Sequence, residues 1–264
     1  MCGFAMTEPE AGSDVASLQT TAARDGNEWV IEGQKHLISN AGIADLYLVF
    51  VKTQPEARSR GISICLVPAE TPGLTFLGPQ LMAAAHPLGR LQFRDCRIPH
   101  DALLGSLDQG FALGMATLDR VRPSVGAAAC GMAARALDEA ARHARHRRQF
   151  AQPLAEMPLV REKLGRMATD LDAARLLVYR AAWEIDGAPG RHSVSAAMAK
   201  SFATEMAQRV VDEAIQIVGG LGVLVGHPVE RLYRSVRALR IYEGATDIQR
   251  LIVAGGLFDE AGHA

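Results

Sequence analysis

The sequence has few cysteines, and none is placed for a disulfide framework or a metal site. Cys2, Cys65, Cys96 and Cys130 lie far apart, no C-x-x-C pair occurs, and no histidine stands at metal-ligand spacing from them. Secreted disulfide domains and zinc modules depend on such spacings. We therefore expect reduced, mostly packed thiols, no metal ion and a reducing compartment.

Long apolar runs and an excess of charge of one sign are also missing. No run approaches the length of a membrane helix, and the first residues lack the basic and apolar regions of a secretory signal. With 28 basic and 29 acidic residues, the net charge of −1 gives no general attraction to nucleic acid or to an anionic membrane. We expect the chain to bind neither, and to work in the cytoplasm, or in the mitochondrial matrix if it is eukaryotic.

The chain has enough hydrophobic residues to form one large domain or two ordinary ones, because they make up 48% of its 264 residues. Residues 1–107 are dense in glycine, proline and short β-branched or aromatic runs. Strands are predicted near residues 29–31, 46–51, 62–67 and 91–93. Turn sequences such as Asp25-Gly26-Asn27 separate them, so neighbouring strands are expected to be antiparallel. The first domain is predicted to be a small antiparallel β-barrel or sandwich.

Residues 108–264 have a different composition, with Ala, Leu, Arg, Glu and Met recurring at three-to-four spacing. Helices are predicted near residues 109–146, 154–187, 191–218, 228–237 and 245–257. Glycine-rich stops end two of them, at residues 187–190 and 219–222. The fold class is therefore α+β, with the β-domain followed by an all-α domain of the four-helix-bundle type.

The stretch around Glu243 is the first candidate for catalytic chemistry. Glu243 stands between the apolar and aromatic pair Ile241-Tyr242 and Gly244, which frees the backbone. Partial desolvation by Ile241 and Tyr242 would raise the pKa of the carboxyl toward working pH, as a general base requires. A surface glutamate before a helix capped by Thr246 or Asp247 gives the same pattern, and this stretch alone favours that simpler interpretation.

Four other stretches are candidates for ligand binding, and each has an ordinary structural explanation. The loop at residues 6–14 has small residues and two hydroxyls that suit an anion or a flat ring, but Gly12-Ser13-Asp14 is also a common turn. The hydroxyl of Ser39 follows a strand and could face this loop, but Ser39 is also explained as an ordinary strand end. The basic run at residues 142–150 suits a pyrophosphate, with Phe150 available for stacking, yet such runs are usually solvated faces. The glycines within residues 216–220 would let a ligand approach the backbone closely, but they are also explained as a helix C-cap.

Together, the order and spacing of these stretches resemble the acyl-CoA dehydrogenase family over essentially the whole chain. The motifs are Thr7-Glu8-Pro9-x-Ala11-Gly12-Ser13-Asp14, Leu118-Asp119 with Arg122, Ala136-Leu137-Asp138-Glu139-Ala140, Arg147-x-x-Phe150, Gln216-Ile217-Val218-Gly219-Gly220 and Ile241-Tyr242-Glu243-Gly244. The resemblance implies an FAD enzyme of fatty acid β-oxidation that converts an acyl-CoA to the trans-2-enoyl-CoA and passes electrons to an electron-transfer flavoprotein. It also implies a homodimer or homotetramer.

The resemblance places the family's catalytic base at Glu243, which would remove the α-proton of the thioester while a hydride leaves the β-carbon for flavin N5. The backbone N–H of Glu243 would polarise the thioester carbonyl, and Gly244 would let the loop approach it. The residues expected to bind FAD are Phe4, Met6, Thr7, Gly12, Ser13, Leu37, Ser39, Arg147, Phe150, Gln216, Gly219, Gly220, Thr246 and Asp247. Those expected to bind substrate are Ser13, Asp119, Arg122, Tyr242 and Gly244. Among the FAD ligands, Arg147, Phe150, Gln216, Gly219 and Gly220 would hold the FAD of the neighbouring subunit.

The chain departs from the family pattern at several of these places. Leu37 stands where a tryptophan is usual, so access of solvent or oxygen to the flavin can differ. Ala151 replaces a glycine, Met157-Pro158 replaces a phenylalanine and glutamine, and Ala245 replaces a threonine or serine. Thr246 is the nearest hydroxyl that can compensate for Ala245.

The family's amino-terminal helical domain has no counterpart in this sequence, which begins at the strand expected to contact the flavin. We expect either a fragment, or a family member that obtains this domain from a partner chain. Other possibilities are an acyl-CoA oxidase, a nitroalkane-type flavoenzyme, or a non-catalytic subunit. A purely structural subunit has no chemical need for a carboxylate at Glu243, which favours the dehydrogenase.

Overall fold

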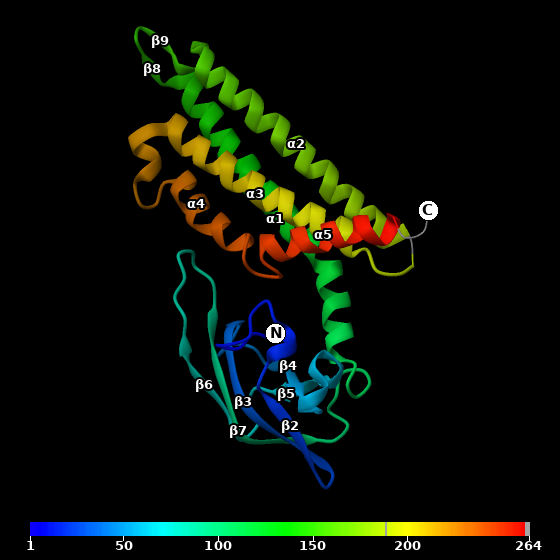
Figure 1. Ribbon diagram of the computed structural model, residues 1–264. Helices are drawn as coiled ribbons and strands as arrows, with labels where there is room; N and C mark the ends of the chain where they lie inside the picture. Colours follow the sequence, from blue (N-terminus) through cyan, green and yellow to red (C-terminus); the bar gives the residue numbers. More distant parts are fainter. Residues whose placement is uncertain (188, 262–264) are drawn as a thin grey trace. The chain divides into compact units, whose positions relative to one another are not determined.

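The computed structural model describes residues 1–187 and 189–261. The chain divides into two compact units, Met1–Ala116 and Thr117–Ala264. The first unit is built on a curled sheet, and the second consists of helices and one short hairpin (Figure 1). The predicted α+β class, with a β-domain followed by a helical domain, is confirmed.

Seven strands form the sheet of the first unit. They are β1 Cys2–Ala5, β2 Thr21–Asp25, β3 Glu28–Ser39, β4 Leu46–Lys52, β5 Ile62–Pro68, β6 Leu74–Pro79 and β7 Leu88–Pro99. The strand order is β1-β4-β2-β3-β7-β6, with β5 paired to β4. Short 3₁₀ turns at Val15–Ser17 and Pro55–Gly61 lie between strands.

Most neighbouring strands are antiparallel, as the turn sequences predict. The β2–β3 hairpin pairs Asp25 with Glu28 across the predicted turn, and β3–β7, β4–β5 and β6–β7 are antiparallel as well. The pairs β1–β4 and β2–β4, which no predicted turn connects, are parallel. These strands are far apart in sequence, and local turn chemistry carries no information on how distant strands pair.

The core of the first unit lies on alternate positions of the long strands. Ile31, Val49 and Phe93 are fully buried, as expected for strands with one face on a core. Cys65 and Cys96 are also buried free thiols, and burial raises their pKa values to about 12 and about 11. Both thiols are therefore packed in the core, as predicted, and the raised pKa values make them poor nucleophiles.

Five α-helices make up most of the second unit within the described residues. They are α1 Gly110–His146, which begins in the first unit, α2 Pro158–Gly187, α3 Ser193–Val218, α4 Pro228–Leu239 and α5 Thr246–Ala261. Strands β8 Arg148–Gln149 and β9 Gln152–Pro153 form the hairpin, and 3₁₀ turns occupy Leu154–Glu156 and Gly219–Val223. All five predicted helices are present. The second begins at Pro158 rather than at 154, because the preceding residues form a 3₁₀ turn and proline favours the first helical position.

Alanine and glycine line the contacts between the long helices of the second unit. A Cβ at Gly126 of α1 would lie 2.9 Å from Cγ2 of Val178 in α2 and 3.3 Å from the carbonyl oxygen of Ala199 in α3. Ala133 of α1 and Ala203 of α3 are fully buried in the same core. Small side chains therefore let the helices approach closely, and little room remains for larger ones.

We expect Ala133→Leu to lower the free energy of unfolding by about 1–3 kcal/mol, because extra methylene groups overpack a dense core. Guanidinium denaturation followed by far-UV circular dichroism measures this. Ala128→Leu is the matched control, since Ala128 is exposed on the same helix. Its effect is expected to stay within about 0.5 kcal/mol. Equal effects of the two substitutions would contradict this account of the core.

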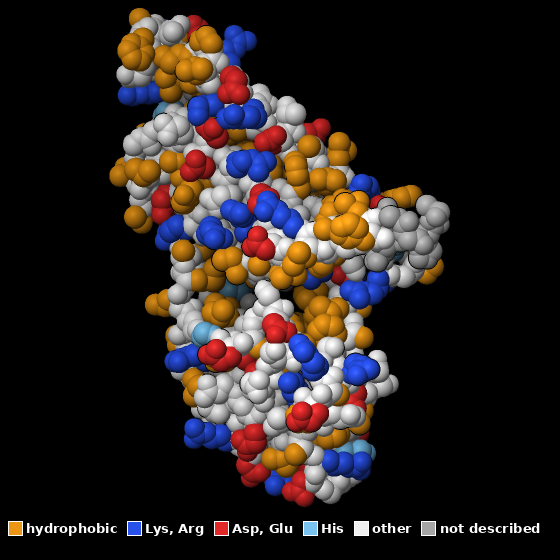
Figure 2. Space-filling model, viewed as in Figure 1, with side chains coloured by type: hydrophobic (Ala, Val, Ile, Leu, Met, Phe, Trp, Pro, Cys, Tyr) orange, Lys and Arg blue, Asp and Glu red, His pale blue; other side chains and the backbone are white. Residues whose placement is uncertain are grey.

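Charged side chains of both signs are intermingled over the helices on the face shown in Figure 2. Several form ion pairs, such as Arg166 with Glu213 at 2.6 Å, and Lys163 contacts the same carboxylate. Among the described residues, no helix is long and apolar enough to cross a membrane. Within the same residues, no group of His, Cys, Asp and Glu is placed to hold a metal ion.

Candidate active site

Glu243 lies in the tight connection between α4 and α5. Its backbone is left-handed, with φ +55°, and Gly244 follows with φ +98°. The N–H of Thr246 donates to the carbonyl of Arg240 at 3.0 Å and closes the loop. The left-handed φ of residue 244 favours glycine, and a Cβ there would also lie 2.3 Å from Nε2 of Gln249. A left-handed glutamate costs on the order of 1–3 kcal/mol, and such strain is typical of functional positions.

Glu243 is half-buried, and one oxygen of its carboxylate, Oε2, is buried without a hydrogen-bond partner within the described residues. Burial raises the pKa of Glu243, although the cations of Lys200 and Arg122 oppose this shift. Ile241 and Tyr242, which the sequence suggested as a shield, are 58% and 43% exposed. The raised pKa of Glu243 agrees with the sequence prediction, and burial is its cause.

Two buried charged residues support the loop from α1. Asp119 and Arg122 are 3% and 4% exposed, and Nη1 of Arg122 donates to Asp119 at 2.8 Å. Nε of Arg122 also donates to the carbonyl oxygen of Glu243 at 3.1 Å. The second oxygen of Asp119 accepts from Arg191 and from Ser193. Both oxygens of Asp119 are thus engaged, and its predicted contact with substrate remains a prediction.

Sequence reasoning missed two further groups that hold this loop. Nζ of Lys200, on α3, donates to the carbonyl oxygen of Gly244 at 2.7 Å, and Nε2 of Gln249, on α5, donates to the same oxygen at 3.1 Å. Lys200 has a signal in the sequence, because it replaces an apolar residue at helical spacing between Ala196 and Ala203. That pattern indicates a buried lysine without indicating which loop it meets.

In the first unit, a buried ion pair anchors the loop at residues 6–14. Oε1 of Glu8 accepts from Nζ of Lys35 at 2.7 Å and from the N–H of Thr20 at 3.0 Å. Lys35 also donates to the carbonyl of Met6 at 3.2 Å. Burial raises the pKa of Glu8, but the Lys35 cation and the hydrogen bonds outweigh it and hold that pKa below its usual value. The sequence did not identify either partner as the anchor of this loop.

The predicted cofactor contacts of this loop differ in exposure. Thr7 is half-buried, Ser13 is exposed, and neither hydroxyl makes a hydrogen bond in the part of the chain that the structure describes. A Cβ at Gly12 would meet nothing within 4 Å, so its backbone is open to a ligand. Met6 is 7% exposed, and the ring of Phe4 packs against Phe50 with centroids 4.8 Å apart.

Leu37 and Ser39 lie at an irregularity of β3. The pairing of β3 with β7 shifts register between Lys35 and Ile38, and Leu37 there has φ +55° and is 49% exposed. Its N–H donates to Oε1 of Gln80 at 2.8 Å. Oγ of Ser39 is 2.8 Å from Nε2 of His86, so the Ser39 hydroxyl already has a partner.

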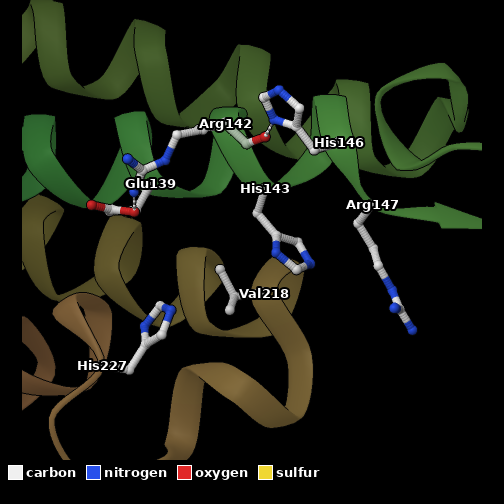
Figure 3. A pocket seen from close by; sticks show the side chains of 7 residues that line it. All are labelled: Glu139, Arg142, His143, His146, Arg147, Val218 and His227. Atoms are coloured by element: carbon white, nitrogen blue, oxygen red, sulfur yellow. Dashed lines mark hydrogen bonds and ion pairs between the residues drawn. The ribbon is translucent and has the colours of Figure 1, made fainter.

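The basic run contributes to a pocket of about 440 Å³ in the second unit (Figure 3). The pocket is lined by Glu139, Arg142, His143, His146, Arg147, Val218 and His227. His143 extends from α1 toward Val218 and His227, with Arg147 beyond the end of the helix (Figure 3). The pocket therefore joins the predicted clamp residue Arg147 to a segment more than 70 residues away in sequence.

The pocket offers hydrogen-bond donors that an anion could use. Nδ1 of His227 accepts from the N–H of Val229 at 3.3 Å, which leaves Nε2 as the ring nitrogen that can donate to a ligand. Burial lowers the pKa of His143, and Arg147 and His227 lower it further. Arg147 forms no ion pair within the described residues, unlike Arg142, which pairs with Glu139. An arginine and histidine donors are thus available to a ligand.

Phe150 and Ala151 form the two-residue turn of the β8–β9 hairpin. Their φ angles are +51° and +64°, which is the pattern of a type I′ turn. Ala151 therefore adopts the conformation for which glycine is better suited. Phe150 is 89% exposed on this turn.

Gln216, Gly219 and Gly220 lie at the carboxyl end of α3. Gly219 has φ +71°, and its N–H donates to the carbonyl of Ile215, so the helix C-cap expected as the simpler explanation is present. All three residues are exposed, and nothing lies within 4 Å of a Cβ built on either glycine. Thr246 is buried and donates to Arg240, while Asp247 is exposed in the first turn of α5.

Comparison with known proteins identifies both units. Residues 3–96 match the middle domain of acyl-CoA dehydrogenase, and residues 108–258 match its C-terminal domain. Cyclohexane-1-carbonyl-CoA dehydrogenase of Geobacter metallireducens is 38% identical over 99% of this chain and 69% of its own length. The mitochondrial short-chain specific acyl-CoA dehydrogenase of Homo sapiens is 43% identical over 96% of this chain and 62% of its own length.

A solved structure, the butyryl-CoA dehydrogenase of Megasphaera elsdenii, superposes with a TM-score of 0.95 at 35% identity, covering 98% of this chain and 68% of that one. The chain thus spans roughly two thirds of the length of such relatives. Since the two matched domains account for nearly all of its residues, the chain belongs to the acyl-CoA dehydrogenase family of flavoprotein oxidoreductases.

Proposed function

We propose that this chain catalyses the FAD-dependent α,β-dehydrogenation of an acyl-CoA thioester to the trans-2-enoyl-CoA, with Glu243 as the base. The observation that carries the proposal is the state of Glu243. Its carboxylate has a buried oxygen without a partner and a raised pKa. Its backbone N–H also makes no hydrogen bond within the described residues. One residue therefore offers both a proton acceptor and a free donor.

These two groups have complementary tasks in the reaction. The α C–H of a thioester is a weak acid, and donation from the N–H of Glu243 to the carbonyl oxygen stabilises the charge that develops there. The Glu243 carboxylate then accepts the α-proton, for which a pKa nearer to working pH is favourable. Bound FAD supplies the two-electron oxidation of the Cα–Cβ bond. The left-handed backbone at Glu243 and Gly244 presents both groups from one short loop.

The chain offers groups suited to FAD in both units. In the first, the hydroxyls of Thr7 and Ser13 and the open backbone of Gly12 are free for a ligand. In the second, Arg147 and His227 provide donors for phosphate oxygens. Following the family resemblance, the first set serves the FAD of the same subunit and Arg147 serves that of a neighbouring subunit. The active form is then a homodimer or homotetramer.

Arg147→Gln is expected to raise the dissociation constant of FAD about 10- to 100-fold, because a charged hydrogen-bond donor contributes about 1.5–3 kcal/mol. Fluorescence titration of the apoprotein with FAD measures this constant. Arg145→Gln is the matched control, since Arg145 is exposed on the same helix end and does not line the pocket. If both variants bind FAD like the parent, Arg147 is not part of the cofactor site.

Anaerobic mixing of the FAD-loaded protein with a panel of straight-chain, branched and cyclic acyl-CoA thioesters tests the function. We expect at least one substrate to bleach the oxidised flavin, with mass spectrometry detecting an enoyl-CoA that has lost two hydrogen atoms. Absence of bleaching with the whole panel would contradict the proposal.

The electron acceptor is proposed to be an electron-transfer flavoprotein. An oxidase is the second candidate, favoured by the exposed Leu37 in place of the family's tryptophan. Reoxidation of the substrate-reduced protein by air and by an electron-transfer flavoprotein, measured in parallel, separates the two. Faster reoxidation by air would identify an oxidase.

A further inference from the structure

Lys200 is the least exposed charged group near the proposed base. Its side chain on α3 is 0% exposed, and its Nζ donates to the carbonyl oxygen of Gly244 at 2.7 Å. Among the described residues no carboxylate lies within ion-pair distance of its Nζ, although the charge of Glu243 acts on it. Burying an ammonium that no carboxylate contacts directly is costly, and an apolar side chain of similar length would avoid that cost. Packing of α3 therefore gives no reason for a lysine at this position.

The bond from Lys200 belongs to a set of three donors that converge on two successive carbonyl groups. Arg122 on α1 donates to the oxygen of Glu243, while Lys200 on α3 and Gln249 on α5 donate to the oxygen of Gly244. Gln249 also donates to the oxygen of Glu243 at 3.4 Å, so the two carbonyls are tied to three helices. With the carbonyls fixed, the Glu243 N–H is left unpaired within the described residues.

We propose that Lys200 is a positioning residue, which pins the Glu243–Gly244 loop through the Gly244 carbonyl and places a cation beside the Glu243 carboxylate. The proposal rests on the proposed function and deepens it, because it explains how the base and the free N–H are held ready. Lys200 does not contact substrate in this account. It acts through the loop.

The charge of Lys200 has a separate consequence from its hydrogen bond. The charged groups that act on Lys200 are Glu243 and Arg122. Burial lowers the pKa of Lys200 to about 8, and Glu243 raises it against the effect of Arg122. In turn, the Lys200 cation lowers the pKa of Glu243, opposing burial. Removing the cation must therefore raise the pKa of Glu243 further.

Lys200→Met and Lys200→Gln in the FAD-loaded protein test the role of the hydrogen bond and the role of the charge. Lys200→Met removes the bond and the charge, so we expect kcat to fall about 10- to 100-fold, as for loss of a charged hydrogen bond. The acid limb of the kcat/KM profile is expected to move to higher pH, with a smaller change in KM. Lys200→Gln keeps a neutral donor, so it should shift the acid limb equally while retaining more of kcat.

Hydrogen exchange of the peptide covering residues 240–249 provides a readout independent of activity. Faster exchange is expected in Lys200→Met, a smaller increase in Lys200→Gln, and no increase in Ser201→Ala, whose hydroxyl bonds only within its own helix. Parent-like kcat, acid limb and exchange in a folded Lys200 variant would overturn the proposal. If the parent does not react with any acyl-CoA, the proposed function fails, and the exchange data alone decide whether Lys200 holds the loop.

Discussion

Glu243→Gln is expected to reduce the rate of flavin bleaching by an acyl-CoA roughly 100- to 10,000-fold or more, the range for loss of a general base. Glutamine retains the size and the backbone N–H of residue 243 but cannot accept the α-proton. Substrate binding is therefore expected to survive while chemistry stops. Anaerobic stopped-flow mixing measures the rate, and titration with an enoyl-CoA measures binding. Parent-like bleaching by Glu243→Gln would show that another group is the base.

The same substitution is expected to leave the fold intact or to stabilise it. Burial raises the pKa of Glu243 in the folded protein above its value in the unfolded chain. Stability from the protonated form is fully present below the unfolded pKa and is lost as pH rises through the raised folded pKa. At neutral pH the ionised carboxylate is therefore a cost, which glutamine removes. Thermal unfolding at pH 7 should give an equal or higher Tm for Glu243→Gln.

The pH profile of the parent provides a further check on the base. Activity requires ionised Glu243, so kcat/KM should fall as the pH drops through its pKa, and this limb should lie above the ordinary glutamate value of 4.5. Glu162→Gln serves as the control, because Glu162 is an exposed residue of α2. Its rate and acid limb are expected to match those of the parent. An acid limb at the ordinary glutamate pKa would argue against a desolvated base.

Local patterns predict much of this fold because they report local geometry. The three-to-four spacing of apolar residues marks all five helices, and Gly244 after Glu243 indicates a loop that glycine must complete. The parallel pairing of β1 with β4 has no such local signal, since more than 40 residues separate the paired positions. Helix ends and hairpins are thus readable from sequence, whereas pairing between distant strands is not.

The candidate site is likewise predictable from the sequence only where its signals are local. Glu243 is recognisable by its neighbours in sequence, but its supports Arg122, Lys200 and Gln249 come from three helices that only the tertiary fold brings to one loop. A lysine among alanines on α3 indicates burial, and nothing local indicates its partner. Likewise, the loop containing Glu8 and Glu10 has two carboxylates around one proline, and only the structure shows that Glu8 is the buried one.

Lys35→Met is expected to lower the free energy of unfolding of the first unit by about 3–5 kcal/mol. The substitution leaves the Glu8 carboxylate, which is 4% exposed, without its cation in a buried site. It also removes the donor to the Met6 carbonyl, so the loop expected to line the flavin loses part of its anchor. Glu8→Gln should have an effect of similar size, because it leaves the fully buried Lys35 ammonium unpaired.

The two tryptophans of the chain allow this unit to be followed separately. Trp29 is 8% exposed in the β-sheet unit, and Trp183 is 74% exposed on α2. In a Trp183→Phe background, Trp29 is the sole tryptophan, and its fluorescence during urea denaturation reports on the first unit. Lys52→Met is the matched lysine control at the end of β4, with an expected effect within about 0.5 kcal/mol. A comparable loss from Lys52→Met would point to a general effect of removing charge.

The double variant Glu8→Leu with Lys35→Met separates the charge from the anchor. If an unpaired buried charge causes most of the loss, the double variant should be more stable than either single variant, since no charge remains. It should still be less stable than the parent, because the N–H of Thr20 loses its carboxylate acceptor. Strictly additive losses would mean that Glu8 and Lys35 act independently, and the buried pair would then not be the anchor of the loop.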